Sequence, residues 1–62
     1  MEEIIHILMQ RDGITKGKAA ALYDQTQQEI DEVLGRRGSY DEIEDILAYN
    51  LGLEPDYIMN FL

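Results

Sequence analysis

Ser39-Tyr40-Asp41-Glu42 fixes the start of a helix and, with it, the fold class of this chain. The stretch has the form of a capping box, in which the Ser39 hydroxyl accepts a hydrogen bond from the Glu42 backbone N–H and the Glu42 side chain returns to Ser39. Apolar residues at helical spacing follow it as far as Leu51. The sequence therefore predicts a helix to about Leu51, with five residues on its buried side: Tyr40, Ile43, Ile46, Leu47 and Leu51.

Two more helices are predicted before the capping box. The first runs from about Glu2 to Arg11, with Gly13 just past its end. The second and longest begins after Thr15, which is its expected N-cap, and continues to about Arg36. Apolar residues and one threonine form a heptad-like seam along it. The seam consists of Ala19, Tyr23, Thr26, Ile30 and Val33.

Glycines are expected to end these helices, because glycine readily adopts the left-handed conformation found just after a helix. Gly13, Gly38 and Gly52 stand at the three positions concerned. A last short turn is predicted from residue 53, with Pro55 at its first helical position. The chain is apolar up to Leu62, so we expect this end to dock on the core or on a partner. The predicted fold is all-α, a single domain over residues 1–62.

The small size of the domain favours association with a second copy. A chain of about 60 residues buries only about 60 % of the surface that its unfolded form exposes. The sequence has 62 residues and no cysteine, so no disulfide adds stability. A homodimer through the long helix and the apolar C-terminal residues is therefore expected. The residues expected in its core or dimer interface are Tyr23, Ile30, Val33, Tyr57, Ile58, Phe61 and Leu62.

The groups that catalysis requires are scarce. Ser39 is the one serine and already has a capping role, while the one histidine, His6, reads as a half-exposed helical residue. No glycine-rich phosphate loop is present, and the carboxylates do not fit an EF-hand. We expect no catalytic residue, no metal site and no cofactor, and hence no enzyme. Two weaker alternatives stay open: an anion at Lys16-Gly17-Lys18, and a weakly held divalent cation at residues 41–45.

Acidic residues dominate the surface. The chain has 13 Asp and Glu against 5 Lys and Arg, for a net charge of −8. One interpretation is a solvated surface that keeps a small protein soluble. The other is an acidic face that docks a basic surface on another protein, in the extreme case by mimicking nucleic acid in a nuclease or helicase channel. The candidate partner-binding residues are Glu29, Glu32, Asp41, Glu44 and Asp45.

A glycine between the second and third predicted helices also suggests a helix-turn-helix regulator. The charge opposes nucleic-acid binding, because DNA affinity comes largely from Lys and Arg. A structural accessory subunit of a larger assembly is a third interpretation. No stretch reaches the roughly 18 apolar residues of a membrane span, and two glutamates stand where a signal peptide has basic residues. A cytoplasmic protein is expected, with no membrane partner.

Two stretches resemble a family of small phage and prophage proteins. They are residues 6–15, His-Ile-Leu-Met-Gln-Arg-Asp-Gly-Ile-Thr, and residues 52–57, Gly-Leu-Glu-Pro-Asp-Tyr, together sixteen of 62 positions. The start of the long helix at Lys16-Gly17-Lys18 departs from the acidic, alanine-rich pattern of that family. The resemblance carries no catalytic motif. It implies an inhibitor of host defence, similar to the tiny proteins directed against the Hachiman system, with a defence ATPase, helicase or nuclease as partner.

Overall fold

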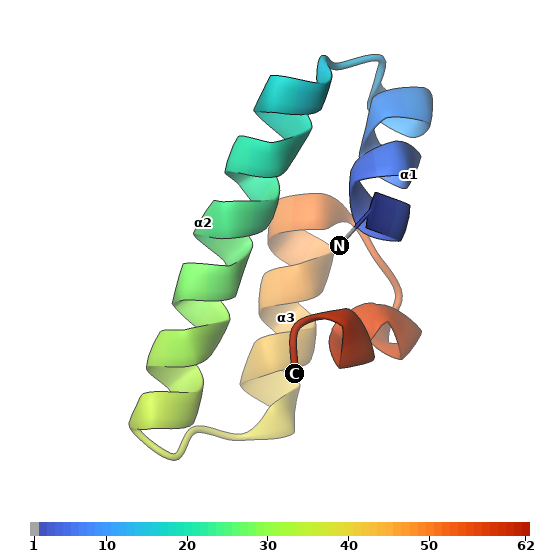
Figure 1. Cartoon of the computed structure of the whole chain (residues 1–62). Coiled ribbons are helices and arrows are strands. Elements are labelled where there is room, and N and C mark those ends of the chain that lie inside the picture. The colour runs from blue at the N-terminus through green and yellow to red at the C-terminus, as the bar shows by residue number, and fades with distance from the viewer. Residues whose placement is uncertain (1) are drawn as a thin grey trace.

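Three α-helices and a short 3₁₀ helix make up the computed structural model, which describes residues 2–62 (Figure 1). The elements are α1 (Glu2–Asp12), α2 (Lys16–Gly35), α3 (Tyr40–Leu51) and η1 (Pro55–Asn60). No strand occurs in this part of the chain, so the all-α prediction is confirmed. The helix bounds lie within about a residue of those predicted, as expected where clear caps mark the ends.

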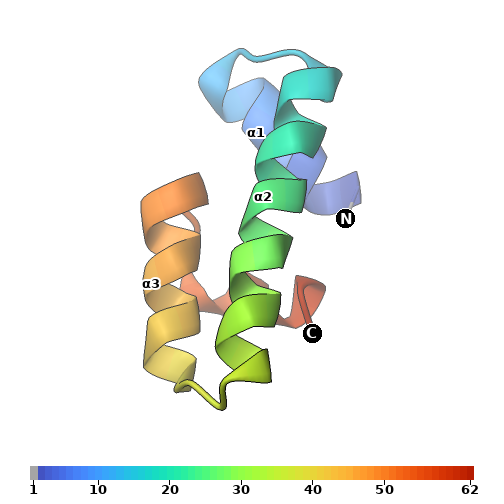
Figure 2. The same cartoon turned by 90° about the vertical axis from the view of Figure 1, so that its left-hand side faces the viewer.

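The 20-residue α2 is the longest helix and the central element of the fold. α1 lies beside the N-terminal half of α2 (Figures 1 and 2). α3 runs antiparallel to α2 and lies beside its C-terminal half. η1 follows α3 and crosses behind the α2–α3 pair in the view of Figure 2. The result is an elongated bundle with extents of 34 × 18 × 17 Å.

One apolar core joins all four elements. The predicted seam of α2 is buried along its whole length and faces the other helices of the same chain. Amphipathic helices gain most of their stability from this kind of packing. Because other elements of the same chain cover the seam, it is not available to bind a second copy. The core residues that α1 and α3 contribute are Ile4, Ile5, Leu8, Ile43, Leu47 and Leu51.

The expectation for the buried side of α3 is wrong at Tyr40. This side chain is 64 % exposed. Tyr40 is the first residue of α3, and α2 has already ended at Gly35, so no helical turn covers it. Ile46 is half-buried rather than buried and lines a groove between α2 and α3.

The predicted N-caps are present, but the capping box is only half formed. Ser39 Oγ accepts the Glu42 backbone N–H at 3.3 Å, and Thr15 Oγ1 accepts the N–H of Lys18 at 3.2 Å. The expected return contact from Glu42 to Ser39 is wrong. Glu42 Oε2 instead accepts a hydrogen bond from Arg36 Nη2 at 2.6 Å, because the cation just past the end of α2 attracts this carboxylate.

The turn after α2 differs from the prediction. The left-handed residue is Arg37, with φ of 58°, and not Gly38. The Gly38 N–H bonds to the Val33 carbonyl at 2.7 Å, as in a Schellman motif. Glycine is needed at position 38 because a Cβ there would lie 2.5 Å from Val33 Cγ1. After α1 the predicted left-handed glycine is confirmed, with φ of 65° at Gly13, and Gly52, which was predicted to end α3, also has a left-handed φ of 63°.

The C-terminal residues dock on α2 of the same chain. The sequence predicted docking either on the core or on a partner, and the structure shows the first. Tyr23 Oη donates to the Asn60 carbonyl at 2.8 Å, and Gln27 Nε2 donates to the Phe61 carbonyl at 3.0 Å. The rings of Tyr23 and Phe61 stack with their centroids 4.6 Å apart. Phe61 is 5 % exposed, whereas Leu62 is 54 % exposed. The core of the same chain therefore holds this segment.

Candidate functional site

A shallow groove of about 540 Å³ runs between α2 and α3. Its walls present more apolar than polar surface, and two carboxylates stand among them. The volume falls in the range of about 300–1,000 Å³ typical of ligand sites, although this groove is open to solvent. The lining residues are Glu29 from α2 and Asp45, Ile46, Ala48, Tyr49 and Asn50 from α3.

Asn50 links the two walls of the groove. Its Nδ2 donates to Glu29 Oε2 at 2.8 Å and lies 3.4 Å from Thr26 Oγ1. The Thr26 hydroxyl itself donates to the Leu22 carbonyl at 2.9 Å, so this buried polar side chain of the core is satisfied. Glu29 Oε2 also accepts from Gln25 Nε2 at 3.5 Å. Glu29 is thus held in place by its neighbours.

Tyr49 and Asp45 form the open side of the groove. Tyr49 is 92 % exposed, the highest value among the exposed large hydrophobic residues. Asp45 is also exposed and takes part in no hydrogen bond or ion pair with any residue of the described part of the chain. The two residues are four positions apart on α3, so their side chains lie on adjacent turns of one helix face.

The residues of the predicted acidic face do not all lie at one site in the structure. Glu29 and Asp45 line the groove together. Glu32 is exposed and stands three residues beyond Glu29, which places it on the same side of α2. Asp41 is exposed and Glu44 half-buried, and neither lines the groove. Tyr49 and Asn50, which the sequence analysis did not select, complete the site.

The residues expected in a core or dimer interface belong mainly to the monomer core. Tyr23, Ile30, Val33 and Phe61 are buried within one chain. Tyr57 and Ile58 are half-buried, and Leu62 is exposed. A homodimer stays a prediction, and the residues of this set that are still accessible to a second copy are Tyr57, Ile58 and Leu62.

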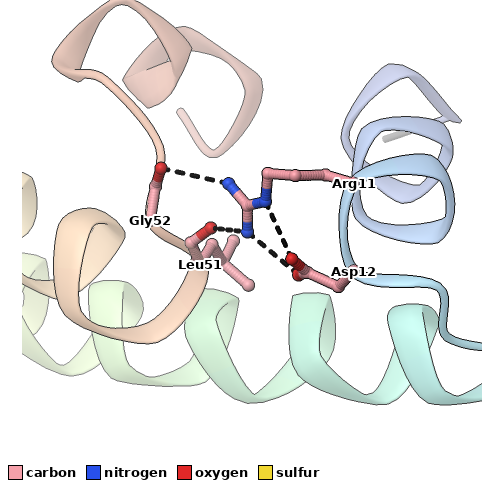
Figure 3. A network of polar contacts seen from close by, with 4 residues as sticks. All are labelled: Arg11, Asp12, Leu51 and Gly52. Atoms are coloured by element: carbon pink, nitrogen blue, oxygen red, sulfur yellow. Dashed lines mark hydrogen bonds and ion pairs between the residues drawn. The ribbon is translucent and has the colours of Figure 1, made fainter.

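Arg11 joins the two stretches that carry the family resemblance (Figure 3). Its Nη1 donates to the Gly52 carbonyl at 3.1 Å, and its Nη2 donates to the Leu51 carbonyl. Asp12 holds the guanidinium from the other side, with Nε–Oδ1 at 2.9 Å and Nη2–Oδ2 at 3.0 Å. Arg11 therefore caps the C-terminal carbonyls of α3 from α1. This Arg11 network (Arg11, Asp12, Leu51 and Gly52) gives both motifs a structural role.

Substituting Arg11 with Gln is expected to lower the free energy of unfolding by about 1 kcal/mol. The value is at the low end for charged hydrogen bonds because the Arg11 side chain is 41 % exposed. Urea denaturation followed by circular dichroism measures it. Lys18→Gln removes the same charge from an exposed site and should not lower the midpoint. Equal losses in the two variants would contradict a specific role of Arg11.

Asp12 gives the Arg11 network a pH dependence. The hydrogen bond from Arg11 holds the pKa of this carboxyl below its ordinary value of 3.8. A lowered pKa stabilises the folded state above the ordinary value, and this contribution disappears as the pH falls through the lowered one. The difference in urea midpoint between the native chain and Asp12→Asn should accordingly be present at pH 7 and shrink below about pH 4.

The geometry of the α2–α3 pair does not favour a helix-turn-helix regulator. A helix-turn-helix joins its two helices at about 90–120°, whereas α2 and α3 lie side by side and antiparallel (Figures 1 and 2). Arg36, one of the few cations near the turn, is paired with Glu42. Both observations argue against the helix-turn-helix interpretation.

Comparisons with protein-family models, curated proteins and solved structures find no match to this chain. Among residues 2–62, no group of three His, Asp or Glu side chains is arranged to hold a metal ion. Within the same range, no helix has both the length and the apolar character needed to cross a membrane.

Proposed function

We propose that this protein is a non-enzymatic binding protein that inhibits a bacterial defence complex by direct protein–protein contact. The α2–α3 groove is the observation that carries the proposal. It combines an apolar lining, the Glu29 and Asp45 carboxylates and a tyrosine that is 92 % exposed. Aromatic residues are enriched in protein interfaces, where a buried tyrosine often provides much of the binding energy.

The charge of the chain favours a basic partner. A net charge of −8 on 62 residues creates a negative potential that steers a positively charged surface toward the protein. ATPases, helicases and nucleases that act on nucleic acid carry such surfaces, because phosphate binding requires Lys and Arg. The resemblance to small phage and prophage proteins adds the context of host defence, and the Hachiman system is the first candidate.

A plating assay tests the inhibitor role directly. In cells that carry the Hachiman system, expression of this protein is expected to restore plaque formation by a phage that the system blocks. Cells without the defence system serve as the control, and plating there should not change. Unchanged plating in the protected cells would contradict inhibition of that system.

Charge reversal then tests the acidic face against the purified defence complex. The variant Glu32→Lys/Asp45→Lys leaves Glu29 intact, because Glu29 also holds Asn50 and its loss would disturb the hairpin. We expect binding to weaken at least tenfold, with an unchanged circular dichroism spectrum. Asp24→Lys/Glu54→Lys changes the net charge equally at exposed sites outside the groove. Equal weakening in the two double variants would contradict a local binding face.

A further inference from the structure

We propose that the α2–α3 groove binds an arginine side chain of the partner protein, with Asp45 contacting the guanidinium and Tyr49 stacking on it. This inference rests on the proposed function and specifies the chemistry of its binding site. Asp45 and Tyr49 are four residues apart on α3, so their Cβ atoms lie about 5–6 Å from one another. One planar cation can therefore contact both side chains.

Both side chains are available for such a contact. The Tyr49 ring is 92 % exposed, so neither of its faces is covered by the chain. The Asp45 carboxylate has no hydrogen-bond or ion-pair partner among residues 2–62. The opposite wall adds a second carboxylate, since only Oε2 of Glu29 accepts from Asn50 and Gln25. None of the described residues that line the groove is basic, so its charge is complementary to a cation.

Arginine fits this arrangement better than lysine does. A guanidinium is planar, stacks on aromatic rings and donates two parallel hydrogen bonds to a carboxylate. A lysine ammonium is a strongly hydrated point charge that loses more on leaving water. The mainly apolar lining around Ile46 and Ala48 suits the aliphatic stem of either residue, so the selectivity comes from the guanidinium.

The groove is also placed so that its occupation leaves the core undisturbed. Gln27 holds the C-terminal segment through the Phe61 carbonyl, while Glu29 lines the groove. These two residues are separated by about 200° around the axis of α2. The groove thus opens on the side of the α2–α3 pair away from the docked C-terminus, which lies behind the pair in Figure 2.

A nuclear magnetic resonance titration tests the inference with a defined probe. The ¹⁵N-labelled protein is titrated with N-acetyl-arginine N-methylamide, and the neutral isostere N-acetyl-citrulline N-methylamide is the ligand control. We expect saturable shift changes confined to amides at residue 29 and residues 45–50, in the millimolar range appropriate to one side chain. The citrulline probe should give no such changes, and the lysine analogue should bind at least threefold more weakly.

Two single variants with matched controls locate the contact. Tyr49→Ala and Asp45→Asn are each expected to weaken arginine binding at least threefold. Tyr40→Ala removes an exposed tyrosine of the same helix outside the groove, and Asp41→Asn neutralises an exposed acid there, so both should bind as the native chain does. Equal binding of citrulline, or equal losses in the controls, would overturn the inference.

The outcomes separate this inference from the proposed function. If the protein restores phage plating but Tyr49→Ala binds the defence complex as tightly as the native chain, the arginine site is wrong and the inhibitor role stands. If arginine binds the groove as expected but plating is never restored, the site stands and the inhibitor role fails.

Discussion

Replacing Phe61 with Ala is expected to lower the free energy of unfolding by about 3 kcal/mol. The ring is 5 % exposed and stacks on Tyr23, so its removal leaves a cavity between α2 and the C-terminal segment. A domain of this length has a total stability of only about 3–9 kcal/mol. The variant should consequently show a much lower melting temperature by circular dichroism, with part of the population unfolded at 37 °C.

Leu62→Ala provides the control in the next position. Leu62 is 54 % exposed, and truncating it should change the free energy of unfolding by less than about 0.5 kcal/mol. A similar loss in both variants would mean that Phe61 is not specifically docked. No loss in either would show that the C-terminal segment contributes little to the fold.

The turn between α2 and α3 is expected to respond in opposite directions at two adjacent residues. Gly38→Ala should lower the free energy of unfolding by about 2 kcal/mol, because its new Cβ would meet the buried Val33 side chain. Arg37→Gly should raise it by about 1 kcal/mol, because Arg37 holds a φ of 58° that glycine adopts without strain. Urea midpoints of the two variants measure both effects.

A neutral control separates this backbone effect from charge. Arg37→Gln removes the positive charge but keeps a side chain at the same positive φ, so it should show no gain. If Arg37→Gln were as stable as Arg37→Gly, the gain would come from charge and not from the left-handed conformation.

The helices could be predicted from the sequence because their signals are local. Thr15 and Ser39 cap the N-termini of α2 and α3 as expected. Each hydroxyl accepts a backbone N–H only three residues further along, so the contact does not depend on distant parts of the chain. The seam of α2 is buried as its spacing indicated. The errors occur where tertiary contacts decide. Glu42 turns to Arg36, and the close approach to Val33 requires glycine at position 38.

The candidate site could be predicted only in part. Glu29 and Asp45 were selected for their charge, and they do line one groove. Sequence spacing could not pair them, because they stand on different helices whose register depends on core packing. Asn50 was missed, although an amide on the otherwise apolar last turn of α3, together with Thr26 in the seam of α2, signals a polar contact between helices. Tyr49 was missed because exposure cannot be read from the identity of a tyrosine.

The Arg11 network has a consequence for how the molecule opens. α1 packs mainly on α2, and Arg11 ties it by hydrogen bonds to the C-terminal end of α3, with partners 40 and 41 residues away. An element that packs mainly on one neighbour can detach in local fluctuations that leave the remainder folded. Here detachment of α1 also uncaps α3. The amide protons in the last turn of α3 should therefore become less protected from solvent exchange whenever α1 detaches, which couples the opening of these two helices.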